Sequence, residues 1–575
     1  MGDIAVDITD RSDGSKARSR ILRYDEVFDV QSGQTRLIKT IKSNVKRQSG
    51  RKAVLVVRRI INEKGLLMNT EVDIKSRHVT QVMQEINSDV EDISLKTNPP
   101  VVSLEIMFHS RMALQEKLEQ ARAAEPIDED LVSELAITTD FAQTEHVTQL
   151  ASLSSLLDAG EITWELLWTI FPPNILVYRY HRLVEQDQVL ELRSIKKFKL
   201  VSRPSYWQLN CRIVTDDGVK FGFAYEPFQM LIEEFSGTRK IVDLHTYPLS
   251  YHSNPADVRA EALSRGRRYT ALREPCVMET SGPAMFEKRD SQEEAHVFKF
   301  ASQGRTIIDP AGFRSFNPNI EFMPDVHRGL SRQELTDEQL IVSTPVAFGF
   351  CFGNKKWGAF AMSRLKDVDW DDQAFKDLVL DKSKKMLVRS MVKQHSSKDD
   401  EFDDIVKGKV AELTKRPLYS VSAGDLGIDP ETVDKRLSER ESHDIKRNAL
   451  VSIFLRQLEY YQGILILTTN QIAQCDAAFE SRVHISHEYP DLDETARRQI
   501  WEMFLRRLKD VQKGVAIDVT EEDISHLAKI KMNGRKIKNT LNSARIVAKD
   551  LGEVFSISHI KLVLGATKSG VHMER

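Results

Sequence analysis

Gly463-Ile-Leu-Ile-Leu-Thr-Thr-Asn470 is a short apolar run bounded by polar residues. Such a run is typical of a strand that is buried on both faces of a parallel sheet. Asn470 falls where this strand would end, and ligands of open α/β sheets bind outside the carboxyl ends of their strands. The run therefore predicts an α/β domain in the second half of the chain, with Asn470 at the edge that binds a ligand.

A nucleotide site on such a sheet would need two further motifs upstream of this strand. Phosphoryl transfer uses a glycine-rich loop with a Lys and a hydroxyl, and a carboxylate that organises magnesium. The only candidate for the loop GxxxxGK[ST] is Lys407-Gly-Lys409, which is followed by Val410 and lacks the upstream glycine. Asp425 and Asp444 are carboxylates without an apolar strand in front of them. Both Walker motifs are absent from the sequence, so we predict no cofactor-binding and no metal-binding residues.

The composition is that of an ordinary protein with several domains. At 575 residues and 65.7 kDa the chain exceeds one hydrophobic core, and domains of roughly 100 to 200 residues are expected. The hydrophobic fraction of 41% is enough for sizeable cores. The net charge of −3 provides no overall attraction to nucleic acid, which is therefore not expected as a partner.

Cysteine usage and hydropathy bear on the compartment. No apolar run approaches the roughly 18 residues that would span a bilayer, and residues 1–20 do not resemble a signal peptide. We expect an intracellular protein in a reducing compartment, the cytoplasm or the nucleus, that is neither secreted nor membrane-spanning. The cysteines are widely spaced without a CxxC pair, which indicates free thiols: Cys211, Cys276, Cys351 and Cys475.

The N-terminal part is predicted to contain a tail and a small mixed region. Residues 1–35 lack hydrophobic periodicity and are predicted to be disordered. Within 36–160, a hairpin is expected around Asn62-Glu-Lys-Gly65, followed by helices over 105–125 and 130–158. Nine basic residues and no acidic one occur between positions 36 and 62. They could contact nucleic acid or anionic lipid, but the favoured interpretation is that they flank the hairpin.

Residues 161–395 are predicted to form a β-rich domain. Asp216-Asp-Gly218 separates two alternating runs, and Gly353-Asn354 separates two aromatic runs, so each marks a hairpin turn. Asp309-Pro-Ala-Gly312 is expected to be a turn. Helices are expected over 257–272 and 371–394.

Several segments occur in the order found in fungal AAA+ ATPases that carry an uncharacterised N-terminal domain, and the chain resembles that family beyond about residue 50. The resemblance implies a truncated AAA+ α/β core over 396–490 and a helical lid over 491–565. It rests on these segments: Trp164-Glu-Leu-Leu-Trp-Thr-Ile-Phe171, Lys355-Lys-Trp-Gly358, Arg416-Pro-Leu-Tyr-Ser-Val-Ser-Ala-Gly-Asp-Leu-Gly427, Asp444-Ile-Lys-Arg-Asn-Ala-Leu450 and residues 463–493.

The resemblance also implies roles for three residues. Asn470 matches sensor 1, Arg482 matches the arginine finger that reaches a neighbouring subunit, and Arg535 matches sensor 2 of the lid. ATP, Mg²⁺, a ring of AAA+ subunits and a protein substrate are implied by the family alone. The alternative is that Asn470 merely ends a strand and that both arginines are surface charges.

Relatives carry the Walker A segment between the equivalents of Lys409 and Val410, and the Walker B segment between those of Glu439 and Arg440. Both segments are lost here while their flanks stay similar to the family, which indicates in-frame loss by splicing or an error in the gene model. Three hypotheses follow. The complete product is an ATPase that remodels proteins, or this chain is a non-catalytic subunit offering Arg482 to a complete neighbour, or its N-terminal domains are an adaptor.

Overall fold

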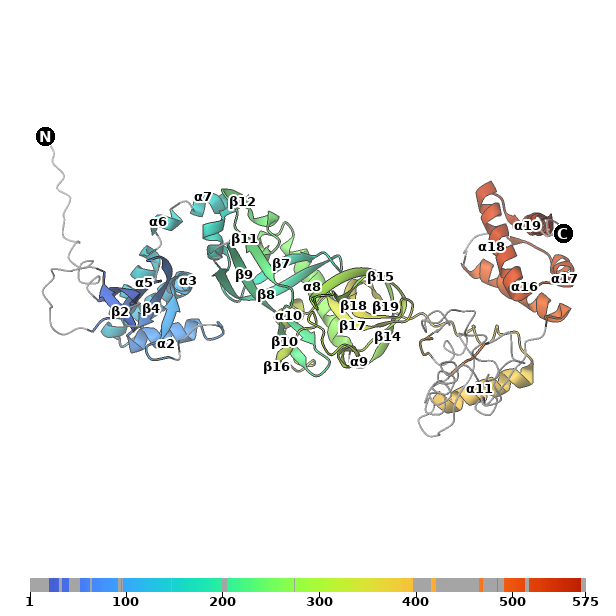
Figure 1. The fold of residues 1–575 in the computed structure, drawn as a ribbon, viewed down its shortest axis with the longest axis horizontal. Helices are drawn as coiled ribbons and strands as arrows, with labels where there is room; N and C mark the ends of the chain where they lie inside the picture. Colours follow the sequence, from blue (N-terminus) through green and yellow to red (C-terminus); the bar gives the residue numbers. More distant parts are fainter. Residues whose placement is uncertain are drawn as a thin grey trace. The chain divides into compact units, whose positions relative to one another are not determined.

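The computed structural model divides the chain into two compact units, Met1–Asp367 (unit 1) and Val368–Arg575 (unit 2), shown in Figure 1. The boundary between the units, at residue 367, lies before the predicted end of the β-rich domain at residue 395. The helix Lys382–Ser396 therefore belongs to unit 2. The structure describes residues 20–29, 34–40, 52–62, 65–91, 95, 97–145, 147–151, 153–198, 204–272, 275–396, 415–419, 465–468, 483, 491–511 and 517–569.

Unit 1 begins with a five-stranded sheet in the order β2-β1-β3-β4-β5. The expected hairpin is confirmed, because β3 and β4 pair antiparallel in the register Leu55↔Ile74. The prediction of disorder over 1–35 is wrong for 21–29, which form β1 parallel to β3. The strands are β1 (Ile21–Asp29), β2 (Gln34–Lys39), β3 (Leu55–Ile61), β4 (Leu67–Ile74) and β5 (Val101–Ser103).

Strand β1 was not predicted because ion pairs with residues distant in the sequence stabilise it. Arg58 on β3 contacts Glu26 at 2.5 Å, Glu71 at 2.8 Å and Asp73 at 2.9 Å, and Arg59 contacts Asp25 at 2.6 Å. Charged residues of β1 are thus matched by partners more than thirty positions away. The hairpin of the favoured interpretation is present, but Arg58 and Arg59 lie within its strand β3 and pair with acidic residues instead of flanking it.

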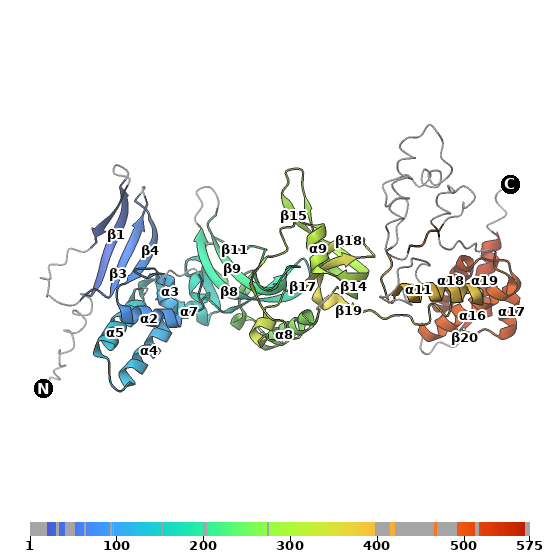
Figure 2. The ribbon, with the colours of Figure 1, turned by 90° about the horizontal axis from the view of Figure 1, so that it is seen from below.

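Helices pack on this sheet through a core that includes Leu55, Val72, Met83, Leu114 and Phe141 (Figure 2). The helix expected over 130–158 is broken into three pieces by turns near residues 145 and 151. The helices are α2 (Arg77–Ile86), α3 (Leu104–His109), α4 (Arg111–Ala123), α5 (Glu129–Thr144), α6 (Val147–Leu150) and α7 (Leu153–Asp158).

A second sheet has the order β13-β7-β8-β9-β10-β16, with β11 paired to β9. Its core contains Trp164, Trp168 and Trp207, and the Trp207 indole donates to the Trp164 carbonyl at 3.0 Å. Trp164–Ile170 is a 3₁₀ helix, not a strand, and β6 (Glu161–Thr163) pairs with β12 (Thr238–Lys240). The sheet's strands are β7 (Leu176–His181), β8 (Gln186–Phe198), β9 (Tyr206–Asp216), β10 (Phe221–Tyr225), β11 (Met230–Glu233), β13 (Tyr247–Pro248) and β16 (Val326–Gly329).

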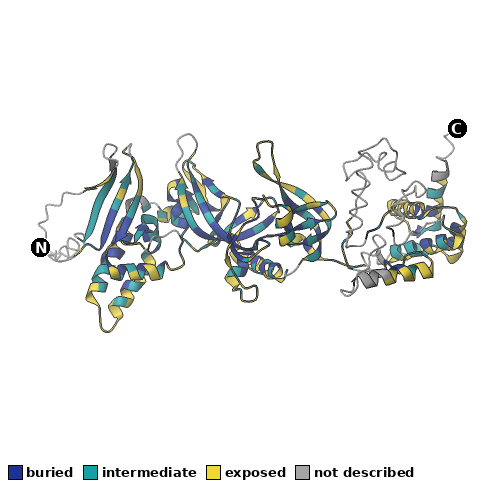
Figure 3. Ribbon diagram, turned by 60° about the horizontal axis from the view of Figure 1, so that its bottom comes forward, coloured by how far each residue is buried: buried dark blue, intermediate teal, exposed yellow. Residues whose placement is uncertain are grey.

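A third sheet closes on itself, because β14 pairs with β15 and β18 while β17 pairs with both of those strands. The hairpin around Gly353 is confirmed by β17 and β18. Figure 3 shows buried residues along the strands of these sheets. The strands are β14 (Cys276–Arg289), β15 (Ala295–Ile308), β17 (Val346–Cys351), β18 (Lys356–Ala361) and β19 (Leu365–Asp367).

Three helices accompany the second and third sheets: α8 (Pro255–Ala271), α9 (Pro310–Phe316) and α10 (Asp337–Ile341). The helix expected over 257–272 is confirmed as α8. The turn expected at 309–312 is instead the start of α9, because the Asp309 carboxylate accepts the Gly312 N–H at 2.8 Å and caps the helix.

Unit 2 contains α11 (Lys382–Ser396) and a C-terminal module of helices around its own core, which includes Trp501, Leu527, Ile537 and Leu541. The helix expected over 371–394 begins only at residue 382. Helices within the predicted lid region 491–565 are confirmed. The module comprises α16 (Glu494–Val511), β20 (Ile517–Asp518), α17 (Glu521–Lys529), α18 (Gly534–Leu551), β21 (Phe555–Ser556) and α19 (Ile557–Ser569).

Candidate functional site

Of the three predicted site residues, the structure describes only Arg535. Asn470 and Arg482 lie outside the described residues. Arg535 is the second residue of α18, and its side chain is exposed. Asn533 caps this helix, because its side-chain oxygen accepts the Lys536 N–H at 2.9 Å. The helix start is thus well formed, but the described residues place no other predicted site residue beside it.

The strand predicted over 464–468 is not found in its described part. Residues 465–468 adopt no regular structure, and the Leu467 side chain is 48% exposed. Leu418 and Val483 belong to the two other strands that the family resemblance implies, over 418–422 and 483–486, neither of which would neighbour this one. Both residues also lie outside strands and are 38% and 36% exposed. A strand keeps its backbone groups hydrogen-bonded only if neighbouring strands are present. The rest of the predicted parallel sheet lies outside the described residues.

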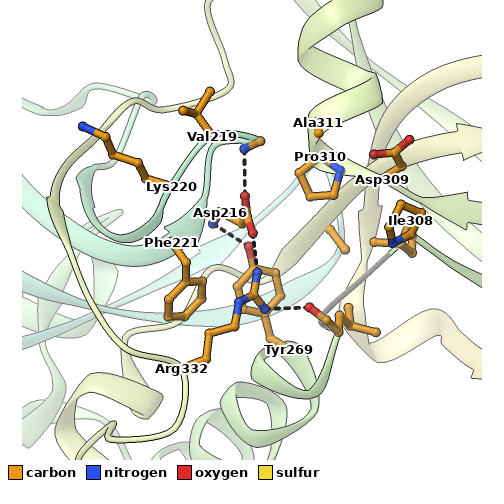
Figure 4. A pocket seen from close by; sticks show the side chains of 14 residues that line it. Asp216, Val219, Lys220, Phe221, Tyr269, Ile308, Asp309, Pro310, Ala311 and Arg332 are labelled. Carbon is orange, nitrogen blue, oxygen red and sulfur yellow. Dashed lines mark hydrogen bonds and ion pairs between the residues drawn. The ribbon is translucent and has the colours of Figure 1, made fainter.

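A cavity of about 280 Å³ lies in unit 1, beside the turn between β9 and β10 (Figure 4). Its walls come from this turn, the end of α8, the end of β15, the start of α9 and the β17 residue Ala347. Apolar side chains such as Phe221, Leu272 and Ile308 dominate the lining. The charged lining residues are Asp216, Asp309, Lys220 and Arg332, so the signs balance.

The turn itself is held by the two aspartates that the sequence singled out. Asp216 accepts the Gly218 N–H at 2.7 Å, and Asp217 accepts those of Val219 and Lys220 at 2.8 and 2.7 Å. The second oxygen of Asp217 accepts the Val326 N–H at 2.9 Å, which ties the turn to β16. Burial alone would raise the pKa of Asp217, but these backbone donors outweigh it and hold the pKa below its usual value.

The floor of the cavity is a buried polar cluster. The Tyr269 hydroxyl accepts the Asp216 N–H at 2.8 Å, and burial raises the pKa of Tyr269 to about 12. Arg332 pairs with the Asp216 carboxylate, donates to the Leu272 carbonyl at 2.6 Å and lies 4.2 Å above the Phe221 ring. Figure 4 shows Lys220 directed away from Arg332. These polar groups bind one another, so the cluster supports the turn, and the raised pKa of Tyr269 keeps its hydroxyl protonated rather than activated as a nucleophile.

The sequence signalled only one wall of this cavity. Asp216-Asp-Gly218 was identified as a turn, whereas Tyr269 and Arg332 carried no local pattern. They meet the turn through tertiary packing of α8 and of the loop before α10. Sequence reasoning on a single chain therefore had no signal with which to find them.

The described residues contain one group with metal-ligand spacing, formed by Asp290, Glu294 and His296. All three side chains are exposed at the β14–β15 hairpin. His296 contacts Asp290 at 2.9 Å, and Asp290 also accepts the N–H groups of Gln292 and Glu294. The hydrogen bond from His296 lowers the pKa of Asp290. These hydrogen bonds stabilise the turn between β14 and β15, and this role explains why the three residues lie together.

Comparison with known proteins gives one match. Residues 152–253 match a domain of unknown function, DUF7025. The matched segment contains the 3₁₀ helix with Trp164 and the strands β6 to β13. No curated protein and no solved structure matches the chain. Among the described residues, no helix combines the length and the apolar character needed to cross a membrane.

Proposed function

We propose that this chain is an AAA+-related protein that has lost ATP binding and works as a non-catalytic binding subunit. The observation that carries the proposal is the C-terminal module. The segment that resembles the AAA+ lid folds as α16 to α19 around Trp501 and Ile537, which are fully buried. Its helix α18 begins at Asn533-Gly534-Arg535, where the family resemblance puts the sensor 2 arginine.

The residues present do not fit Mg·ATP. The β and γ phosphates need a cradle of backbone N–H groups and a Lys, and magnesium needs a hydroxyl and a carboxylate. The sequence holds neither motif, and Arg535 lies exposed on α18 without a described partner from such a site. We therefore assign no step of ATP hydrolysis to this chain.

Binding is supported by unit 1. Its three larger sheets have extensive cores, and the cavity beside Asp216 is large enough for a small side chain or ligand. An adaptor needs a stable body that presents such surfaces, and it does not need nucleotide chemistry. A protein partner recognised by unit 1 is therefore part of the proposal.

Isothermal titration of the full chain with Mg·ATP tests the loss of nucleotide binding. We expect no saturable heat, because nothing in the sequence can cradle the phosphates. The matched control is a chain in which both lost segments are restored from a relative, and this control should bind. Saturable binding by the chain itself in the low micromolar range would overturn the proposal.

The second candidate is that the gene encodes a complete ATPase. It is favoured by the joins at Lys409–Val410 and Glu439–Arg440, whose flanks remain similar to the family. Genomic sequence around these codons decides between the two candidates. An in-frame GPPGxGK[ST] together with an apolar run ending in Asp-Glu would establish the complete enzyme, whereas continuous coding sequence would support the non-catalytic subunit.

A further inference from the structure

Helix α18 carries a one-sided row of cations. The helix contains five Lys and Arg residues and a single acidic residue, Asp550, near its end. The side chains of Arg535, Lys538, Arg545 and Lys549 follow one another at steps of three, seven and four residues. At 100° per residue these positions fall within about 80° of the helix circumference and span about 21 Å. We call these four residues the basic stripe.

One face of α18 packs into the core of the module, while Ile546 and Leu551 of the same helix are exposed. Ile537, Leu541, Ala544 and Ala548 are each at most 5% exposed. Arg535, Lys538 and Lys549 are exposed, and Arg545 is half-buried. The stripe is therefore held on a rigid helix whose orientation is fixed by packing, with its charges directed away from the core.

The cations of α18 differ from those of α16 in the same module. Arg498 contacts Glu502 and Glu521 at 2.7 Å, and Arg506 and Arg507 contact Asp377 and Asp371 at 2.9 Å. None of the ion pairs between described residues includes a cation of α18. Acidic residues of unit 2 thus neutralise these arginines of α16 and leave the cations of α18 available to an external anion.

We propose that the basic stripe binds the phosphate backbone of a double-stranded nucleic acid. A linear polyanion matches a linear row of cations, and each neutralised phosphate releases counterions. Helix α18 contains no aromatic residue, so it offers bases of a single strand no stacking platform beside the stripe. Insertion into a membrane would need a broad exposed apolar face beside the cations, and the exposed large apolar side chains of α18 are only Ile546 and Leu551.

This inference is independent of the proposed loss of ATP binding. It differs from the expectation that nucleic acid is not a partner. That expectation rested on the net charge of −3 for the whole chain, which averages the cations of residues 524–549 with acids elsewhere. Phosphate contacts depend on the local charge within about a Debye length, roughly 8–10 Å.

Fluorescence anisotropy of the full chain with a labelled DNA duplex tests the proposal. We expect the duplex to bind, and we expect the logarithm of the association constant to fall linearly with the logarithm of the salt concentration between about 50 and 200 mM. The variant Lys538→Ala/Arg545→Ala/Lys549→Ala removes three phosphate contacts. The slope of the log association constant against log salt should therefore become less steep by about 2.7. The affinity should fall on the order of ten- to hundredfold. Arg535 is left in place because the family resemblance gives it another role.

Two variants serve as controls. Lys382→Ala/Lys509→Ala/Lys561→Ala removes the same charge from exposed sites of unit 2 outside α18, and it should keep the wild-type affinity. Lys538→Arg/Lys549→Arg keeps the charge and should also bind. Circular dichroism should show unchanged helix content in all variants, because the substituted positions lie outside the packed face.

The outcomes that overturn the proposal are specific. Absence of duplex binding at low salt, or equal affinity of the stripe variant and the wild type, would show that α18 is only a solvated face. Stripe-dependent binding to polyglutamate or to phosphatidylserine vesicles, without binding to the duplex, would assign the stripe to an acidic protein or a membrane surface. Tighter binding to a single strand than to the duplex would refute the choice of a double helix.

Discussion

His181 shows how burial of a single side chain makes a fold sensitive to pH. The ring lies on β7, packs edge-on against Phe228 at 5.3 Å and is 7% exposed. Its Nδ1 atom has no hydrogen-bond partner among the described residues. Burial, with a further contribution from the charge of Arg179, lowers the pKa of His181 to about 4. The side chain is thus neutral in the folded protein at neutral pH.

The free energy of unfolding of unit 1 should therefore fall as the pH drops from about 6.5 to 4. Between these pH values the unfolded chain binds a proton at His181, whereas the folded chain does not. The resulting loss in the free energy of unfolding is about 3 kcal/mol over the whole pH range. His181→Phe keeps the ring against Phe228 and should weaken this dependence in urea titrations at several pH values. Part of it should remain, because burial also lowers the pKa of His109 in unit 1 to about 4. His327→Phe, at an exposed ring stacked on Tyr225, should leave it unchanged. Equal curves for His181→Phe and wild type would contradict the assignment.

At the scale of elements, the turn between β9 and β10 depends on a close approach to α9. Gly218 has φ of +83°, and a Cβ atom there would lie 2.5 Å from the Pro310 carbonyl oxygen. Gly237 has a similar φ of +73°, but a Cβ atom would meet nothing within 4 Å. Alanine substitutions at the two glycines therefore separate the free-energy cost of the left-handed backbone conformation from that of the contact with Pro310.

Gly218→Ala should destabilise unit 1 clearly more than Gly237→Ala. The left-handed conformation costs each alanine about 1 kcal/mol, and the contact with Pro310 adds roughly 1–3 kcal/mol at residue 218 alone. Chemical denaturation followed by tryptophan fluorescence measures both. Similar losses for the two variants would mean that the turn and α9 can move apart, and the cavity beside Asp216 would then be adjustable.

Elements with local signals could be predicted from the sequence. The hairpins β3–β4, β9–β10 and β17–β18 carry Gly, Asp or Asn between alternating runs, and α8 follows a helical period. Strand β1 was missed because its stability depends on Arg58 and Arg59, far away in sequence. The cavity was missed for the same reason, since Tyr269 and Arg332 reach Asp216 only through tertiary packing.

At the scale of the whole molecule, the two units have separate hydrophobic cores. In unit 1, Phe348 is 2% exposed within a cluster that includes Phe313 and Phe322. In unit 2, Trp501 is fully buried beside Leu527 and Ile537. None of the core clusters formed by described residues contains members of both units. Separate cores imply that each unit unfolds with its own stability.

Differential scanning calorimetry should accordingly show two transitions whose midpoints respond to different substitutions. Trp501→Ala removes the largest fully buried side chain and should cost unit 2 about 3–5 kcal/mol, lowering one midpoint and leaving the other in place. Phe348→Ala should cost unit 1 a similar amount for the same reason and lower only the second midpoint. The reciprocal pattern is the test, because each variant serves as the control for the other. A single transition that both substitutions lower together would mean that the units fold as one, and the C-terminal module could then not be treated as a separate binding body.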